Sequence, residues 1–324
     1  MKASYLAILL LFIHVGCTTK YKLMVEGENF DALTKITDEK KVCFSPNGGE
    51  NNTNLTFCCY DQGNSMNVYM KDKVLSSAII QKTSGQNFNT SPSYCKANNK
   101  IVFQYFNRNN FDIYYINAQQ GKAITQVTST DENEYNPDWS SDGKMIIFEK
   151  GSTPKTFIKY TSNYVYKKGI HVTENQIWIK NVETGELKMV GQGSFPMFSP
   201  DDKYITYVKY DLNKAKTNET GTIWIMDIEG ENQKQLTGPE LGYASVPAWS
   251  PDGKHLVFQL TKNQKKDSDI YTIDIDGENL KQHTINKSQD FGAYWSEDGF
   301  IYFSSDRGGK AKKYVIWRFK ANVS

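Results

Sequence analysis

The sequence has little of what enzyme active sites and membrane spans are built from. It contains 4 His in 324 residues and no G-x-S-x-G, H-E-x-x-H, Walker or dinucleotide-binding motif. Lys and Arg total 38 against 36 Asp and Glu, so the net charge of +2 gives no general attraction to nucleic acid. After the first residues, no apolar run approaches the roughly 20 residues that a membrane-spanning helix needs. We therefore expect no cofactor and no nucleic-acid partner.

What the sequence has instead is one short phrase that returns six times, about 50 residues apart. The phrase reads YNPDWSSDGKMIIFEK at 135–150, SFPMFSPDDKYITYVKY at 194–210, SVPAWSPDGKHLVFQL at 245–260 and GAYWSEDGFIYFSSD at 292–306, with weaker copies VCFSPNGGENNTNLTFCCY at 42–60 and SPSYCKANNKIVFQYF at 91–106. We assign its aromatic position to Phe44, Tyr94, Trp139, Phe198, Trp249 and Trp295. A repeat of this length is typical of one four-stranded blade of a β-propeller.

Each repeat predicts four strands. An aromatic residue ends the first strand, and Asp-Gly or a variant turns the chain into the second, because these residues accept positive φ. A third strand such as IYTIDI at 270–275 and a short fourth such as KQHT at 281–284 follow. The last repeat has no fourth strand after IWRF at 316–319, whereas LTKIT at 33–37 resembles that phrase. We therefore predict an all-β fold, a six-bladed β-propeller closed by an N-terminal strand, with an unclosed β-sandwich as the alternative.

The beginning of the chain has the features of an export signal. Lys2 precedes an apolar run at 5–15 that is too short to span a bilayer. The letters IHVGC at 13–17 resemble a bacterial lipoprotein box, with His14 in place of the usual aliphatic residue. We expect lipidation of Cys17; cleavage to a soluble form and an uncleaved anchor are the alternatives. The expected organisation is a signal peptide at 1–17, a tether at 18–32 and a propeller at 33–324.

The P-x-W-S-P-D-G-K and I-Y-x-x-D-x-D-G-x-N phrases resemble the repeats of TolB-type β-propellers over roughly residues 33–319. The resemblance is strong in repeats three to six, and similar repeats occur in the propellers of prolyl-oligopeptidase-family enzymes. TolB proteins carry an α/β domain before the propeller, and we expect this chain to lack it because the repeats begin by Val42. The resemblance implies an exported bacterial propeller that faces the periplasm and serves protein contacts.

Few residues are candidates for chemistry. Some sugar-acid lyases with this repeat type hold a divalent metal with clustered His, but His171, His255 and His283 fall at unlike positions of their repeats. The D-x-D-G-x-N letters at 274–279 are read as a tight turn and not as a calcium loop. We therefore predict a non-catalytic cell-envelope scaffold without a metal. A glycan-binding module, a metal-dependent glycan-acid lyase and a hydrolase fragment are the alternatives.

Four cysteines lie in the first two repeats, after Cys17. Cys58 and Cys59 are adjacent in a strand and face opposite sides, so only one of them can face Cys43. A disulfide, a metal site and simple burial of the thiols, including Cys95, all remain open at this point.

The loops carry the clearest sign of a binding surface. Loops that follow the second strand of a repeat are basic, whereas the tight turns on the opposite face are acidic. The longest loop, 151–174, mixes Lys with aromatic residues, which suits a partner with acidic groups. The candidate partner-binding residues are Lys155, Phe157, Lys159, Tyr160, Tyr164, Tyr166, Lys167, Lys168, Lys214, Lys216, Lys265, Lys266 and Arg307. We expect a monomer that binds an envelope protein or acidic ligand in the bacterial periplasm, anchored to a membrane by lipid.

Overall fold

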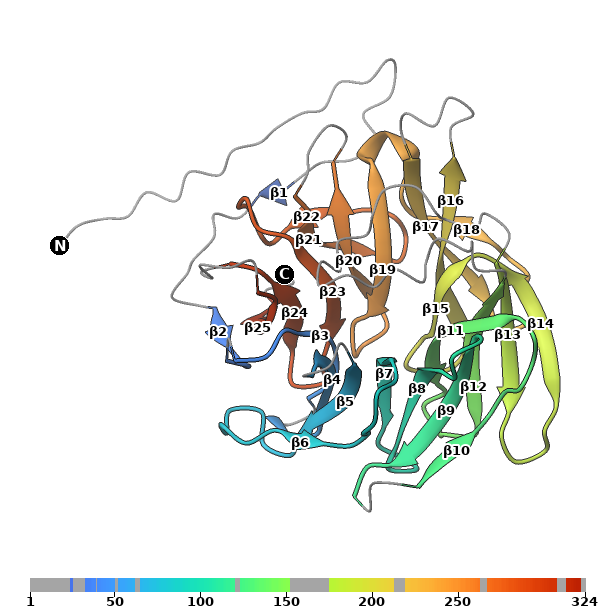
Figure 1. The fold of residues 1–324 in the computed structure, drawn as a ribbon. Coiled ribbons are helices and arrows are strands. Elements are labelled where there is room, and N and C mark those ends of the chain that lie inside the picture. Colours follow the sequence, from blue (N-terminus) through green and yellow to red (C-terminus); the bar gives the residue numbers. More distant parts are fainter. Residues whose placement is uncertain are drawn as a thin grey trace.

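The structure, a computed structural model, consists of strands and short connections (Figure 1). It describes residues 24–25, 33–38, 40–49, 52–61, 65–119, 123–151, 175–212, 219–262, 267–307 and 313–321. Helical structure within these ranges is limited to short 3-10 turns such as η3 (Pro239–Leu241). The all-β prediction is therefore confirmed.

The strands fall into six repeat units that follow one another along the chain. Unit 1 contains β3 (Cys43–Gly48), β4 (Leu55–Tyr60), β5 (Met66–Lys71) and β6 (Ile80–Gln81); unit 2 contains β7 (Asn89–Cys95), β8 (Lys100–Phe106), β9 (Phe111–Asn117) and β10 (Ile124–Gln126); unit 3 contains β11 (Asn133–Trp139), β12 (Met145–Gly151), β13 (Gln176–Asn181) and β14 (Leu187–Gln192). Unit 4 contains β15 (Ser194–Phe198), β16 (Tyr204–Leu212), β17 (Glu219–Asp227) and β18 (Lys234–Gln235); unit 5 contains β19 (Tyr243–Trp249), β20 (His255–Thr261), β21 (Asp269–Asp274) and β22 (Lys281–Gln282); unit 6 contains β23 (Asp290–Trp295), β24 (Phe300–Ser305) and β25 (Val315–Lys320), joined by β2 (Thr34–Lys35). A further short strand, β1 (Met24–Val25), lies parallel to β22.

Within each unit, consecutive strands pair antiparallel. Units 4 and 5 also share one parallel contact, between Gly221 and Tyr243, which joins them into a nine-stranded sheet. The first strand of each unit contacts the first strand of the next, and β23 contacts β3. Figure 1 shows the units side by side around a common centre, an arrangement of propeller type.

The core lies between the units, because the middle strands are apolar on both faces. In β24, Ile301, Tyr302 and Phe303 are all fully buried although their side chains alternate in direction. Ile301 and Phe303 pack with unit 5, whereas Tyr302 packs with Leu55 of unit 1. Each sheet is thus covered on two sides by its neighbours.

The first strand of every unit contains a β-bulge, seen as a register shift against the second strand. One residue at each shift has positive φ. These residues are Ser45, Ser91, Asn136, Phe195, Val246 and Gly292. Positive φ is uncommon for side chains such as those of Val246 (φ 51°) and Phe195 (φ 53°), so the surrounding sheet must hold them there.

The position of the bulge in unit 1 shows that the predicted aromatic position, Phe44, is wrong. Gly48 pairs with Leu55 just as Trp249 pairs with Leu256 in unit 5, so Gly48 and not Phe44 occupies the aromatic position. Phe44 lies before the bulge, opposite Cys58. The Ser-Pro-Asn-Gly letters at 45–48 thus form the bulge, although they resemble the hairpin turn of later repeats.

The Ser-x-Asp-Gly letters form tight turns as predicted. In unit 3 the Ser140 hydroxyl donates to Asp142 Oδ1 at 2.7 Å, and the same carboxylate accepts the Lys144 backbone N–H at 3.0 Å. Gly143 follows with φ 71°, which Gly adopts without strain. Ser250 and Asp252 repeat the contact at 2.6 Å. The acidic residues of these turns therefore stabilise the turns themselves.

A threonine after the outermost strand ties that strand to the third strand of its unit. The hydroxyl oxygens of Thr83, Thr128, Thr237 and Thr284 each accept a backbone N–H from the third strand of their units, at 2.8–2.9 Å. In unit 6 the corresponding acceptor is Thr37, which binds the Ile316 N–H at 2.9 Å. β2 pairs antiparallel with β25, with Thr34 opposite Arg318. The N-terminal segment therefore supplies the outermost strand of unit 6.

One disulfide lies in unit 1, between Cys43 and Cys59, which are opposite each other on β3 and β4. Cys58 and Cys95 are buried thiols. Burial raises the pKa of Cys58 to about 12, so this thiol is inert at neutral pH. A bridge that closes a loop of this length stabilises a fold by about 3 kcal/mol in the chain-entropy view.

We predict that Thr37→Val lowers the free energy of unfolding by about 1–2 kcal/mol, because the buried Ile316 N–H loses its acceptor. The matched control is Thr237→Val, which removes the equivalent acceptor in unit 4. Denaturant unfolding of the two variants should give similar losses. A loss for Thr237→Val with none for Thr37→Val would show that the N-terminal segment contributes nothing to unit 6.

Candidate binding site

Most of the residues that we predict from the sequence to bind a partner lie outside the described part of the chain. This holds for Cys17 and for Lys155, Phe157, Lys159, Tyr160, Tyr164, Tyr166, Lys167, Lys168, Lys214, Lys216, Lys265 and Lys266. Their roles stay predictions. Arg307 is described, and it is 7% exposed. Its expected place on an exposed basic surface is therefore wrong, because its guanidinium lies inside the fold.

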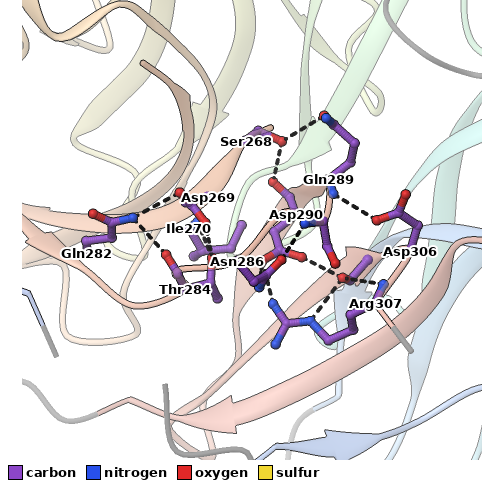
Figure 2. A network of polar contacts seen from close by, with 12 residues as sticks. Ser268, Asp269, Ile270, Gln282, Thr284, Asn286, Gln289, Asp290, Asp306 and Arg307 are labelled. Carbon is purple, nitrogen blue, oxygen red and sulfur yellow. Dashed lines mark hydrogen bonds and ion pairs between the residues drawn. The ribbon is translucent and has the colours of Figure 1, made fainter. Parts of the chain in front are cut away.

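Arg307 belongs to a buried polar network between units 5 and 6 (Figure 2). Its Nη2 donates to Asp290 Oδ2 at 2.5 Å, and its Nε donates to the Ser305 hydroxyl at 3.0 Å. The Ser305 hydroxyl in turn donates to Asp290 Oδ1 at 2.5 Å. Burial raises the pKa of Asp290, while the charge of Arg307 acts in the opposite direction. A buried pair of this kind holds the start of β23 against the end of β24.

Figure 2 also shows how this network continues into unit 5. The Ser268 hydroxyl donates to the Asp290 carbonyl at 2.8 Å. Asp269 accepts the Gln282 amide at 2.9 Å and the Thr284 hydroxyl at 3.3 Å. These polar groups are occupied within the protein, so they fix the two units together and are not displayed for a ligand.

The six positive-φ residues of the bulges form a second group of candidate site residues. Each of them is half-buried. The Ser91 hydroxyl donates to Asn136 Oδ1 at 3.0 Å across two adjacent units. The Asn136 backbone N–H donates to Gln104 Oε1 of the preceding unit at 2.9 Å. The Gly292 backbone N–H likewise donates to Gln259 Oε1 at 2.9 Å. The Ser45 backbone N–H donates to the Ser304 hydroxyl oxygen at 3.3 Å. The second strand of one unit thus binds the bulge of the next.

In unit 3, Glu149 occupies the strand position that Gln104 and Gln259 occupy in units 2 and 5, so a carboxylate replaces their amide. It accepts hydrogen bonds from the Asn136 amide, from Asn175 Nδ2 at 3.1 Å and from the Phe195 N–H. Burial raises the pKa of Glu149, and these donors oppose that effect. The site therefore carries a buried acidic group behind Asn136.

Two further carboxyls have pKa values near neutrality. Burial raises the pKa of Asp138 to about 7, although Ser93 and the Phe198 N–H donate to it at 2.7 and 3.2 Å. Burial likewise raises the pKa of Glu134 to about 7, and a hydrogen bond to Asp112 adds to the shift. Two carboxyls in contact are costly to charge together, so the neighbouring Asp112 makes ionisation of Glu134 less favourable.

The described histidines serve packing. His255 Nδ1 lies 2.5 Å from Asp274 Oδ1, and its ring stacks on Trp295. His283 stacks on Phe319, and burial lowers its pKa to about 3. His171 lies outside the described residues. Among the residues that the structure describes, no three His, Cys, Asp or Glu side chains lie close enough together to hold a metal ion. The described part also contains no helix long and apolar enough to cross a membrane.

We predict that Glu134→Gln reduces the loss of folding stability that occurs as the pH rises. The unfolded carboxyl loses its proton near its ordinary pKa of 4.5, while the folded one keeps it until about 7, so stability falls between these values. Glu134→Gln removes that loss, and its stability relative to wild type should rise by about 3 kcal/mol from pH 4 to pH 8. Denaturant melts across this range test it. The exposed Glu186→Gln should follow wild type, and a stability curve for Glu134→Gln that runs parallel to that of wild type would refute the raised pKa of Glu134.

Comparison with known proteins agrees with this architecture. The family model for the TolB β-propeller domain matches residues 194–323. The Tol-Pal system protein TolB of Francisella tularensis subsp. mediasiatica is 28% identical over 120 residues, which is 37% of this chain and 26% of that protein. The chain thus spans about a quarter of the length of the curated relatives it matches.

Solved structures resemble the fold over most of its length. The putative TolB from Agrobacterium tumefaciens aligns with a TM-score of 0.58 and 16% identity, covering 90% of this chain and 97% of that one. An oligogalacturonate lyase in complex with manganese aligns with a TM-score of 0.56 and 14% identity, covering 90% and 93%. At these identities the structures show a shared fold only. The domain match identifies residues 194–323 as TolB-type β-propeller repeats, and the solved structures extend the likeness in fold over most of the chain.

Proposed function

We propose that this chain is a non-catalytic binding scaffold of the bacterial cell envelope, built on a six-bladed propeller that β2 closes. The similarity to the Tol-Pal system protein TolB carries the proposal, because that protein is by name a component of the Tol-Pal system. The described polar side chains add support. Buried Asp, Glu, Gln and Thr groups bind neighbouring units, and their hydrogen-bonding capacity is used within the fold.

The proposed compartment is the periplasm. The Cys43–Cys59 disulfide supports export, since such bonds persist in oxidising compartments. The apolar run before Gly16-Cys17 supports a lipid anchor on Cys17.

The proposed partner is an envelope protein with an acidic surface, bound by the loop at 151–174 and its neighbours. This loop is the longest of the chain and contains Lys155, Lys159, Lys167 and Lys168 beside four aromatic residues. Exposed Lys side chains chiefly accelerate association with an acidic surface, and salt screens that effect beyond about 8 Å.

A glycan-acid lyase is the second candidate, and the fold likeness to oligogalacturonate lyase favours it. Metal analysis of the purified protein separates the two candidates. The lyase needs a stoichiometric divalent metal, whereas the scaffold needs none, so one metal per chain would contradict the scaffold.

The scaffold is tested by crosslinking in intact envelopes and identification of what is captured. We predict that reversing Lys159, Lys167 and Lys168 to Glu weakens capture of the main partner at least tenfold at low salt without changing the melting temperature. Reversing Asp142 and Asp252 to Lys is the control on the opposite face, and it should lower stability more than capture. Equal capture by wild type and the loop variant, at every salt concentration, would refute the loop surface.

Membrane anchoring is tested separately. We predict that Cys17→Ala moves the protein from the membrane fraction to the soluble fraction, or stops its maturation, because the thiol that would carry the lipid is gone. Membrane fractionation and electrophoretic mobility report both results. Cys17→Ser serves as a second variant, and wild-type behaviour of both would disprove the anchor.

A further inference from the structure

The outer edge of unit 3 differs from the outer edges of the other units. Its outermost strand, β14, has 6 residues, whereas β6, β18 and β22 have 2 and β10 has 3. β14 ends the strand order of its sheet, so no described strand pairs with its outer side. Leu187 is 49% exposed and Met189 is 41% exposed on this strand. A long, apolar edge of this kind is a template for pairing with another chain.

The register shows which main-chain groups face outward. The Asn181 N–H donates to the Glu186 carbonyl, so this pair is hydrogen-bonded and the pairs alternate from there. Leu187 and Met189 belong to the intervening pairs, opposite Lys180 and Trp178. Their N–H and C=O groups therefore point away from β13, toward the open edge.

Unit 5 shows that an outer edge of this protein accepts an extended segment. There β1 pairs in parallel with β22, with Met24 opposite Lys281 and Val25 opposite Gln282. Lys281 and Gln282 are 8% and 3% exposed, in contrast to the exposed residues of β14. No described strand occupies this position at β14, where the turn at Gly230 of unit 4 approaches the Val190 carbonyl.

A cavity of about 380 Å³ lies beside β14, between units 3 and 4. Its lining residues are Met189, Gly191, Gln192, Gly193, Ser194, Val208, Lys209, Tyr210 and Gln233. Lys209 is the one charged residue of this lining. Its Nζ donates to Gln233 Oε1 at 3.0 Å and lies 4.1 Å from the Trp224 ring centre. Among the described residues no carboxylate pairs with Lys209, so the cavity presents a positive charge with only neutral partners.

We propose that β14 and this cavity bind an extended, acidic segment of a partner protein, which adds to β14 as a further strand and places a carboxylate beside Lys209. Main-chain hydrogen bonds to Leu187 and Met189 supply the pairing, and Lys209 supplies the preference for acid. The inference rests on the proposed protein-binding function and names a partner chemistry for it. It uses residues other than those of the loop at 151–174.

The charges along β14 also give the segment a direction. Glu183 and Glu186 lie in the turn before β14, whereas Lys188 lies on the strand itself, and all three are exposed. Lys209 lies near its end, at Gln192. Acidic residues of the partner should therefore cluster at one end of the segment, because they would be repelled at the other.

The probes are two fluorescein-labelled octapeptides of alternating Thr and Val, one with two Glu at its N-terminus and the other with two Glu at its C-terminus. Controls are the counterpart with two Lys and a version with alternate backbone amides N-methylated. By anisotropy, wild-type protein should bind the acidic probe at least tenfold more tightly than either control in one orientation. Equal binding of all three, or none at millimolar protein, would overturn the proposal.

Variants of the protein test the same site. Met189→Pro removes an outward N–H and should weaken binding of the acidic probe at least tenfold. An unchanged circular dichroism spectrum would show that the variant is folded. Lys209→Gln keeps an amide for Gln233 and should weaken the probe at least fivefold, while Lys209→Arg should restore it. Lys254→Gln, in a turn of unit 5, is the charge control. Wild-type affinity in Lys209→Gln would overturn the proposal even if Met189→Pro failed to fold.

The two proposals fail in different ways. If Lys209→Gln and Met189→Pro capture the envelope partner as wild type does, β14 is not the docking edge and the scaffold stands. If wild-type protein binds the acidic probe through β14 but captures no envelope protein, the scaffold fails and the edge remains a peptide site.

Discussion

Every sheet in this protein is apolar on both faces, and the rest of the structure depends on this constraint. A sheet such as β23–β25 with fully buried Ile301, Tyr302 and Phe303 cannot fold alone in water. It must lie between two others, and the arrangement of units around a common centre gives each sheet two such neighbours (Figure 1). The polar contacts then fix spacing and register. Gln104 and Gln259 each bind the bulge of the next unit, which sets how closely consecutive units approach.

Regular features of the fold could be predicted from the sequence because they are local. The Asp-Gly turn, the apolar second and third strands and the threonine after the fourth strand each use residues close together in the chain. The pairing of residues 33–37 with β25 was also predictable, since LTKIT has the same letters as other outer strands. The alignment of unit 1 is harder to predict, because the Ser-Pro-Asn-Gly letters fit both a bulge and a hairpin turn. Their proline aligns with Pro247 in the bulge, and that spacing was the available sign.

The buried charges could not be predicted in the same way. Arg307 lies in a Lys-rich and Arg-rich loop and looks like a surface residue in the sequence, but Asp290 and Ser305 surround it in three dimensions. Glu134 contacts Asp112 from a different strand. Sequence spacing gives no sign of either contact. The same holds for the β14 edge, where a register shift against β13 leaves Val190 as an extra residue.

The use of the N-terminal segment to complete unit 6 has a consequence for how the chain reaches its final state. Thr37 and Ile316 are 279 residues apart in sequence, yet they share a hydrogen bond. An N-terminal strand that emerges first must therefore remain unpaired until nearly the whole chain has followed it. Contacts this distant in sequence slow folding, because the ends of a long loop must meet before any stabilisation is gained. The pairing of β2 with β25 then comes late in folding, and a chain interrupted before β25 would leave two sheet edges open to aggregation.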